Sequence, residues 1–186
     1  MTNMTQPCEA ALRDIMSRQR IHDALVRSCR GVDRLDADLI RSAYHPDGID
    51  DHGSFVGLVD DFIAWVMGNH GDGKIITCTH HLSNILIVVE GTVAHCESYV
   101  LVTHRRMIDG VLCDMLAHGR YLDRFEERAG DWKIAHRVVI GDWDRIDPVE
   151  RQLGGPLTEA LRPSLRSRDD DSYQVLDPRY FVSGST

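Results

Sequence analysis

The stretch Thr79-His80-His81-Leu82-Ser83-Asn84 runs directly into the apolar run Ile85-Leu86-Ile87-Val88-Val89. A run of branched apolar residues of this length predicts a core β-strand, with two imidazoles near its start. Successive strand residues face opposite sides of a sheet, so we expect His80, Leu82 and Asn84 on one face and His81 and Ser83 on the other. Only one of the two imidazoles can then face a given cavity, which argues against a metal bound by the adjacent pair.

The hydrophobic period changes once along the chain, from helical to two. Residues 13–30 form an amphipathic pattern, with Gly31 as a stop signal, Asp36 as the N-cap of a second helix, and a third helix from Asp60 or Asp61. A short strand is expected over 49–55, and longer strands are expected over 76–89, 92–104, 112–127 and 132–142. Three helices followed by a meander of long strands describe an α+β domain, and long antiparallel strands curl to make a cavity.

Composition excludes several classes of function. The 186 residues carry a net charge of -8 without a basic patch, so we expect no nucleic-acid partner. We find no apolar run long enough to span a membrane, and we expect no membrane partner and a cytoplasmic location. Five cysteines without a C-x-x-C pair indicate free thiols in a reducing compartment.

The C-terminal part differs in character from the rest. Gly154-Gly155-Pro156 and Pro163 interrupt any helix there, and residues 166–171 carry mixed charges. We therefore expect one domain over residues 1–148 and an extension over 149–186 that is partly ordered or wraps a neighbouring subunit.

Two further residues, Asp33 and Arg137, could act together with a strand histidine. If the first helix continues, Asp33 follows its buried stripe, where a carboxylate needs a partner such as a backbone amide or an imidazole. An aspartate that holds one ring nitrogen of a histidine orients the other as a general base. Arg137 alternates with Trp132 and Ile134 on the last strand, which predicts that it faces away from them, either in a surface ion pair or beside a substrate oxygen.

Five motifs in this order give a resemblance to a known family. They are Gly31-Val32-Asp33-Arg34, Leu39 through Tyr44-His45-Pro46-Asp47, Thr79 through Asn84, Gly119 through Glu126, and Trp132-Lys133-Ile134 with Arg137. Together they cover roughly residues 10 to 147 and resemble the SnoaL-like branch of the NTF2-like superfamily, with members such as scytalone dehydratase, dehydrochlorinase and polyketide cyclases. The resemblance implies an NTF2-like (cystatin-like) cone-shaped barrel, in which N-terminal helices pack on a strongly curved, mostly antiparallel sheet enclosing a pocket.

The resemblance also implies roles for residues of this chain. In dehydratase-like members a helix aspartate and a strand histidine abstract a proton, and these roles fall on Asp33 and His80. A one-residue slip of the strand would move the second role to His81. The arginine of the dehydrochlorinase pattern falls on Arg137. Ser28 stands where related dehydratases carry a tyrosine, so we name Tyr44, Tyr99 and Tyr121 as candidates for substrate binding, with core packing as the alternative role of each. Asn84 is a further candidate for substrate binding.

No cofactor and no metal are expected. Asp50-Asp51-His52 could supply metal ligands, but no convergent third ligand group can be named, and the flanking glycines favour a solvated edge strand. The resemblance to epoxide hydrolases implies an arginine and an aspartate two residues apart on a strand, which face the same side. That arrangement is disfavoured, because Arg120 and Asp123 are three residues apart and would face opposite ways.

The fold is a poor guide to the reaction, so hypotheses from different classes stay open. The first is a cofactor-independent lyase or isomerase of the dehydratase type, which abstracts a C-H proton from a small, largely apolar ring compound with an Asp-His dyad. The second is a non-catalytic small-molecule-binding or assembly module. The third is the small subunit of a ring-hydroxylating dioxygenase. Related folds associate through the sheet face, so the resemblance predicts a homodimer or homotrimer.

Overall fold

The structure is a computed structural model that describes residues 5–150 and 156–176. The helices are α1 (Thr5–Arg34), α2 (Ala37–Ala43), α3 (Val59–His70), α4 (Pro156–Glu159) and α5 (Ser172–Val175). The strands are β1 (Tyr44–Asp51), β2 (Val56–Leu58), β3 (Ile75–Glu90), β4 (Val93–Ile108), β5 (Val111–Arg128) and β6 (Asp131–Pro148). The expected α+β class is confirmed, and no helix within these residues is long and apolar enough to cross a membrane.

All six strands lie in one sheet, in the order β2-β1-β6-β5-β4-β3. The neighbours pair antiparallel except β1 and β6, which are parallel. The expected meander of long strands is therefore correct, and β1 and β2 extend it at one edge. The edge strands β2 and β3 do not pair with each other, so the part of the chain that is described forms an open curved sheet rather than a closed barrel.

The hairpins of the meander have the turn residues that their geometry requires. Gly91 has a φ of 64°, while Asp109-Gly110 and Ala129-Gly130 have positive φ at both positions. Two-residue turns with positive φ match the right-handed twist of the strands they join. These short connections hold β3 to β6 as consecutive neighbours.

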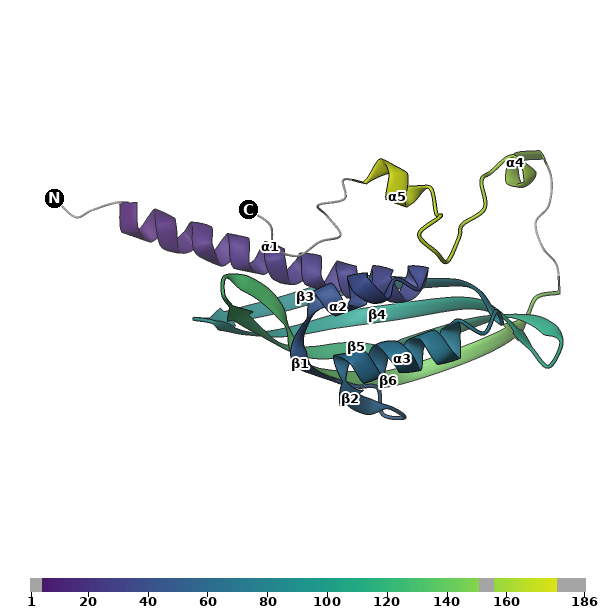
Figure 1. Ribbon diagram of the computed structural model, residues 1–186, viewed down its shortest axis with the longest axis horizontal. Coiled ribbons are helices and arrows are strands. Elements are labelled where there is room, and N and C mark those ends of the chain that lie inside the picture. The colour runs from purple at the N-terminus through teal and green to yellow at the C-terminus, as the bar shows by residue number, and fades with distance from the viewer. Residues whose placement is uncertain (1–4, 151–155, 177–186) are drawn as a thin grey trace.

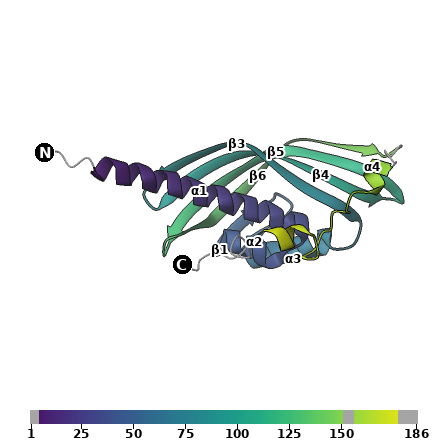
Figure 2. The same cartoon turned by 90° about the horizontal axis from the view of Figure 1, so that it is seen from above.

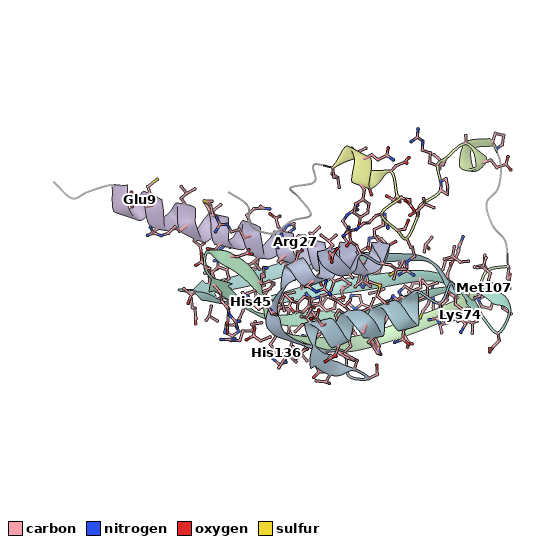
Figure 3. All side chains as sticks on the ribbon, in the orientation of Figure 1. Glu9, Arg27, His45, Lys74, Met107 and His136 are labelled. Carbon is pink, nitrogen blue, oxygen red and sulfur yellow. The ribbon has the colours of Figure 1, made fainter. Side chains whose placement is uncertain are left out.

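Helices α1 to α3 cover one face of the sheet, and the N-terminal end of α1 projects beyond it (Figures 1 and 2). Side chains fill the space between the helices and the sheet, while Glu9 marks the projecting end of α1 (Figure 3). The predicted stripe of α1 is buried: Ile21, Leu25, Cys29 and Val32 are at most 7% exposed. Burial of this stripe holds α1 against the sheet.

Two β-bulges overturn the simple alternation that we expected. On β3, Asn84 and Ile85 lie opposite the single residue Ser98, and Asn84 has a φ of 47°. On β6, Ala135 is the extra residue between the partners of Phe125 and Arg124. One extra residue shifts every later side chain to the other face.

The consequences differ for the two strands. Beyond its bulge, β3 buries Ile87 and exposes Leu86 and Val88, so Asn84 does not continue the face of His80. Beyond the other bulge, Arg137 lies on the same inner face as Trp132 and Ile134, and is 2% exposed. The expectation that Arg137 faces away from them was wrong.

The sequence predicted that the first helix ends at Gly31. That prediction was wrong, because α1 continues through Gly31 to Arg34. Asp36 is the N-cap of α2, as expected, and its carboxylate accepts from the Leu39 amide at 3.1 Å. A Cβ on Gly31 would lie 2.6 Å from Ile40 Cγ1 and 2.7 Å from the Ile40 amide nitrogen. Gly31 is therefore needed for the close crossing of α1 and α2.

Replacing Gly31 with alanine is expected to lower the free energy of unfolding by about 1–3 kcal/mol, because the methyl group overpacks the crossing. Gly68→Ala is the matched control, since Gly68 also lies in a helix and its Cβ would meet nothing within 4 Å. That change should raise stability by up to about 1 kcal/mol. Urea unfolding of both variants checks the pair, and equal effects would contradict the packing role of Gly31.

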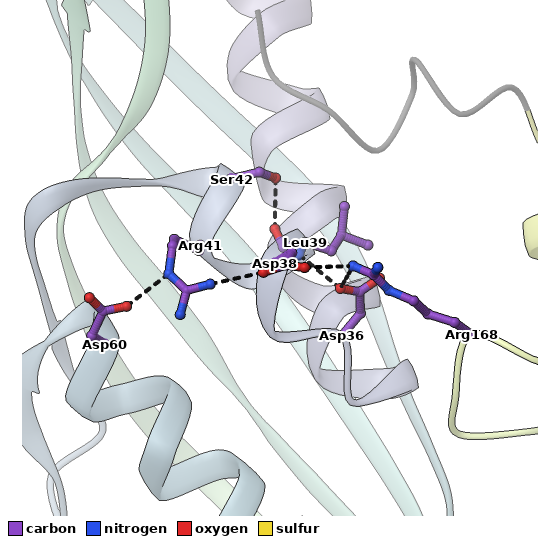
Figure 4. Close-up of polar contacts among 7 residues, drawn as sticks. All are labelled: Asp36, Asp38, Leu39, Arg41, Ser42, Asp60 and Arg168. Carbon is purple, nitrogen blue, oxygen red and sulfur yellow. Dashed lines mark hydrogen bonds and ion pairs between the residues drawn. The ribbon is translucent and has the colours of Figure 1, made fainter.

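The part of the C-terminal extension around α5 lies beside α1 and α2 of its own chain, on the side away from the sheet, whereas α4 lies away from these two helices (Figures 1 and 2). Arg168 donates to the two carboxylate oxygens of Asp36 at 3.0 and 2.7 Å (Figure 4). Tyr173 donates its hydroxyl to the same aspartate at 2.9 Å. Polar contacts therefore fix this segment at the corner where α1 passes into α2.

Candidate active site

Asp33 and His80 meet where the last turn of α1 faces β3. His80 Nδ1 lies 2.6 Å from Asp33 Oδ1, and the His80 backbone amide donates to Asp33 Oδ2 at 3.2 Å. The side chain of Asp33 is 12% exposed and that of His80 is 9% exposed. Both carboxylate oxygens thus engage one residue, which sets the orientation of the ring and leaves Nε2 as its second nitrogen.

The environment favours an ionised aspartate in this pair. Burial by itself would raise the pKa of Asp33, but the hydrogen bond and charge of His80, the His80 backbone amide and the Cys78 thiol outweigh it and lower that pKa. An ionised Asp33 accepts the proton on Nδ1 of His80, so Nε2 is the basic nitrogen of the neutral ring. This is the tautomer that a general base requires.

His80 lines a cavity of about 240 Å³ between the helices and the inner face of the sheet. Its walls are mainly apolar and include Phe62, Trp65, Val100, Val102, Met115 and Val139. Its polar groups include Ser28, His52, His70, His104, Tyr121 and Arg137. A largely apolar cavity with a few convergent polar groups is typical of a site for a small organic molecule.

Arg137 reaches this cavity as part of a buried ion pair. Its Nε and Nη2 donate to Asp123 at 2.7 and 2.8 Å, and its Nη1 donates to the Ser28 hydroxyl at 3.1 Å. The guanidinium also lies 4.0 Å from the ring centroid of Tyr121. Burial would lower the pKa of Arg137, but Asp123 raises it well above the ordinary value, so the group stays charged.

His70 and His104 form an edge-on pair in the cavity wall, with ring centroids 5.3 Å apart. Among the described residues, both ring nitrogens of His104 lack a hydrogen-bond partner, and so does the Nδ1 of His70. Burial, followed by the charge of Arg166, lowers the pKa of His70 to about 4. Burial and the neighbouring His70 lower the pKa of His104 to about 3. Both rings are therefore neutral at physiological pH.

These two histidines predict a loss of stability in mild acid. Each folded-state pKa lies below the unfolded value of about 6.5, so the unfolded chain binds protons first as the pH falls. The free energy of unfolding should therefore fall below pH 6.5 by about 1.4 kcal/mol per pH unit for each histidine. This contribution ends near pH 4 for His70 and near pH 3 for His104.

Urea unfolding at several pH values between 7 and 4 measures this slope. His104→Leu should reduce the slope by about one proton, or 1.4 kcal/mol per pH unit. His95→Leu is the control, because His95 is exposed and should leave the slope unchanged. An identical slope in His104→Leu and the unaltered protein would contradict a neutral buried His104.

Two groups of side chains place potential metal ligands within 4.8 Å of one another, and Cys78 belongs to both. One group adds His70 and His104, and the other adds Asp33 and His80. Burial raises the pKa of the Cys78 thiol far above its ordinary value, and only a thiolate is a good ligand. Asp33 and His80 already bind each other. We therefore interpret neither group as a metal site: His70, His104 and His80 are residues of the cavity wall, and Cys78 and Asp33 pack behind them.

The four predicted substrate-binding residues lie in different places relative to the cavity. Tyr121 lines the cavity. Tyr44 is buried outside its lining and donates its hydroxyl to Asp50 at 2.7 Å. Tyr99 lies on the opposite face of β4 from Val100, and Asn84 is exposed at its bulge. The structure therefore brings neither Tyr99 nor Asn84 to the cavity, because side chains alternate along β4 and the bulge turns Asn84 outward.

Sequence reasoning missed several residues in or beside the site, among them Asp123, His70, His104 and Arg166. Asp123 stood within one of the quoted motifs, but its pairing with Arg137 depends on the register of β5 and β6. His104 lies beside Cys78 across β4 and β3. The local sequence does not show that a histidine in a strand or an arginine in the extension lies at the site, because the position of each depends on long-range packing.

Comparison with known proteins agrees with this fold. The profile of the SnoaL-like domain matches residues 13–138. No curated protein sequence matches the chain. The three structures described next are each below 25% identical to this chain, so they support the fold alone.

A hexachlorocyclohexane dehydrochlorinase, LinA-type3 from Novosphingobium barchaimii, has a TM-score of 0.65 and 18% identity over 78% of this chain and 99% of its own. A provisionally named scytalone dehydratase from Novosphingobium aromaticivorans has a TM-score of 0.61 and 20% identity over 78% and 99%. An NTF2-like protein with a cystatin-like fold from the same organism has a TM-score of 0.57 and 21% identity over 75% and 90%. The NTF2-like, cystatin-like architecture is therefore confirmed.

Proposed function

This chain belongs to the SnoaL-like domain family, and from that premise we propose that it is a cofactor-independent lyase or isomerase of the dehydratase type. In this proposal His80 removes a carbon-bound proton from a small, largely apolar ring compound. The observation that carries the proposal is the 2.6 Å contact between Asp33 Oδ1 and the Nδ1 of His80, the member of the pair that lines the cavity. It supplies a base that is oriented and electrostatically supported.

The proton moves from substrate carbon to Nε2 of His80. Asp33 holds the proton on Nδ1 throughout and stabilises the imidazolium that forms. The electron pair of the broken C-H bond forms a double bond as a leaving group departs, or passes to a neighbouring carbonyl oxygen as an enolate. In the first case the product is an alkene, and in the second it is an isomer reprotonated by the same imidazolium.

Arg137 is proposed to stabilise the negative charge that develops on the leaving group or oxygen. Three of its five N-H groups bind Asp123 and Ser28, which leaves two for a substrate. The bidentate ion pair holds the guanidinium in a fixed place at the cavity wall. A preorganised cation of this kind stabilises developing negative charge more strongly in a dry site than in water.

The cavity supports a substrate of small size and little charge. Its volume of about 240 Å³ is below the range of about 300–1,000 Å³ typical of sites for drug-sized ligands. Its apolar walls favour a hydrocarbon ring, and its neutral histidines suit an uncharged hydroxyl or carbonyl group. The names of two structural neighbours, a dehydrochlorinase and a dehydratase, are consistent with an elimination.

Proton exchange tests the proposal before the natural substrate is known. Small cyclic β-hydroxyketones and ketones are incubated with the protein in D₂O, and deuterium at the acidic carbon and loss of water are followed by NMR and mass spectrometry. We expect exchange or elimination with at least one compound, dependent on His80. Binding without exchange across the panel would favour the ligand-binding module instead, and co-purification with a larger iron-containing protein would favour the dioxygenase subunit.

A further inference from the structure

One arginine of the C-terminal extension, Arg166, contacts the backbone directly behind the Asp33-His80 pair. Its Nε donates to the Asp33 carbonyl at 3.1 Å and its Nη2 to the Val32 carbonyl at 3.1 Å. Its Nη1 donates to the carbonyls of His70 at 3.1 Å and Ile75 at 3.3 Å. A single guanidinium therefore joins four carbonyl groups.

These carbonyls belong to three elements that carry the site. Val32 and Asp33 lie in the last turn of α1, His70 is the last residue of α3, and Ile75 is the first residue of β3. The last carbonyls of a helix lack partners within the helix and form the negative end of its dipole. Arg166 supplies both the donors and the positive charge that two helix ends require, and so ties Asp33 and His70 to the strand of His80.

The segment that presents Arg166 has its own internal and external anchors. Asp170, which is 8% exposed, accepts from the backbone amides of Leu165 at 3.0 Å and Ser172 at 3.2 Å. It also lies 3.6 Å from Arg34, the last residue of α1. Arg168 and Tyr173 bind Asp36 at the start of α2 (Figure 4 shows Arg168). Arg166 thus lies in a segment that is closed internally by Asp170 and tied to α1 and α2 by Asp170, Arg168 and Tyr173.

We propose that Arg166 is a positioning residue for the proton abstraction proposed above, and that the extension is part of the working site. The kinetic consequence of this positioning role rests on the proposed function. Arg166 holds the last turn of α1 so that the Asp33 carboxylate meets both the ring and the backbone amide of His80. The segment lies beyond residue 138, where the family match ends, so this is a feature of the present chain rather than of the matched domain.

Arg166 also acts electrostatically on the cavity wall, at His70. The titratable groups that act on or contact His70 include Arg166 of the extension, His80 of β3, Arg106 and His104 of β4, and His52 directly after β1. Arg166 is the strongest charge acting on His70 and lowers the pKa of that ring. Its removal should therefore change the site electrostatically as well as mechanically.

Variants of the full-length chain test the inference. Arg166→Met keeps the length of the side chain but removes all its donors, while Arg166→Lys keeps the charge and part of the donors. Arg162→Met is the matched control, because Arg162 lies in the same segment, with a side chain 85% exposed, and binds Asp171. The readouts are kcat, KM, the pH profile of kcat/KM, and the downfield NMR signal of the His80 Nδ1 proton.

We expect Arg166→Met to lower kcat by about ten- to a hundred-fold, since small misplacements of a catalytic group cost this much. KM should change much less, the Nδ1 signal should shift or broaden, and the pKa of His70 should rise. Arg166→Lys should recover part of kcat and of the signal, and Arg162→Met should match the unaltered protein. If Arg166→Met does not fold, Arg166→Lys decides the matter by an intermediate kcat and a shifted signal.

Two outcomes separate this inference from the proposed function. A folded Arg166→Met or Arg166→Lys protein with unchanged kcat and unchanged Nδ1 signal overturns the positioning role alone. A shifted signal in Arg166→Met, in a protein whose unaltered form exchanges no substrate proton, supports the positioning of Asp33 and overturns the proposed reaction.

Discussion

Replacing His80 with asparagine is expected to lower the rate of proton abstraction by about 10²–10⁴-fold, the usual contribution of a general base. The asparagine amide can occupy the place of Nδ1 and keep a hydrogen bond to Asp33. It has no basic nitrogen in the place of Nε2. The change therefore removes the base and keeps its partner satisfied, so the thermal midpoint should stay nearly unchanged.

Turnover is followed by deuterium exchange and product formation, and stability by thermal unfolding. His81→Asn is the matched control, because His81 is the exposed neighbour on the opposite face of β3 and should have full activity. A large loss of stability with no activity to lose would assign His80 to packing. Equal losses of turnover in both variants would contradict the assignment of the base to His80.

Replacing Asp123 with alanine is expected to lower the free energy of unfolding by about 3–5 kcal/mol, the cost of leaving one member of a buried ion pair alone. The side chains of Arg137 and Asp123 are 3% and 0% exposed, respectively. Without Asp123 the guanidinium keeps the neutral hydroxyl of Ser28 and the rings of Tyr121 and Tyr44, but no counter-charge among these partners. The charge then stays in a dry site without compensation.

Arg105 and Asp114 provide a matched control on the surface. They form the same bidentate pair at 2.7 Å, but their side chains are 37% and 40% exposed, respectively. Asp114→Ala should therefore cost only about 0–1 kcal/mol. In the double variant Arg137→Met with Asp123→Leu, much of the stability should return, because both charges are gone. Urea unfolding measures all three, and a cost for Asp123→Ala no larger than that for Asp114→Ala would contradict the buried pair.

Local sequence predicted the parts of this protein that local forces decide. The stripe from Ile21 to Val32 specified α1 because apolar residues recur at its helical period, and Asp36 specified the start of α2 because its carboxylate caps that helix. Alternation and glycine turns specified the four long strands of the meander. The order of motifs along residues 10 to 147 indicated the family, which the domain match over 13–138 confirms.

The meeting of Asp33 with His80 was a sequence hypothesis that only the fold could locate. It required α1 to pass through Gly31, which local propensity alone treats as a stop. The close approach of Ile40 explains the glycine, and that approach exists only when α2 has folded back on α1. The catalytic role itself stays a prediction, which the His80→Asn variant tests.

Tertiary structure alone decided which way Arg137 and Asn84 face. Each depends on one extra residue in a strand, and a bulge is set by pairing with a distant partner rather than by the local pattern. The same holds for Asp123, which finds Arg137 through strand register, and for Arg166, which finds four carbonyls through the return of the chain. Periodicity records which residues are buried, whereas the partners of a buried charge are chosen only when separate elements pack together.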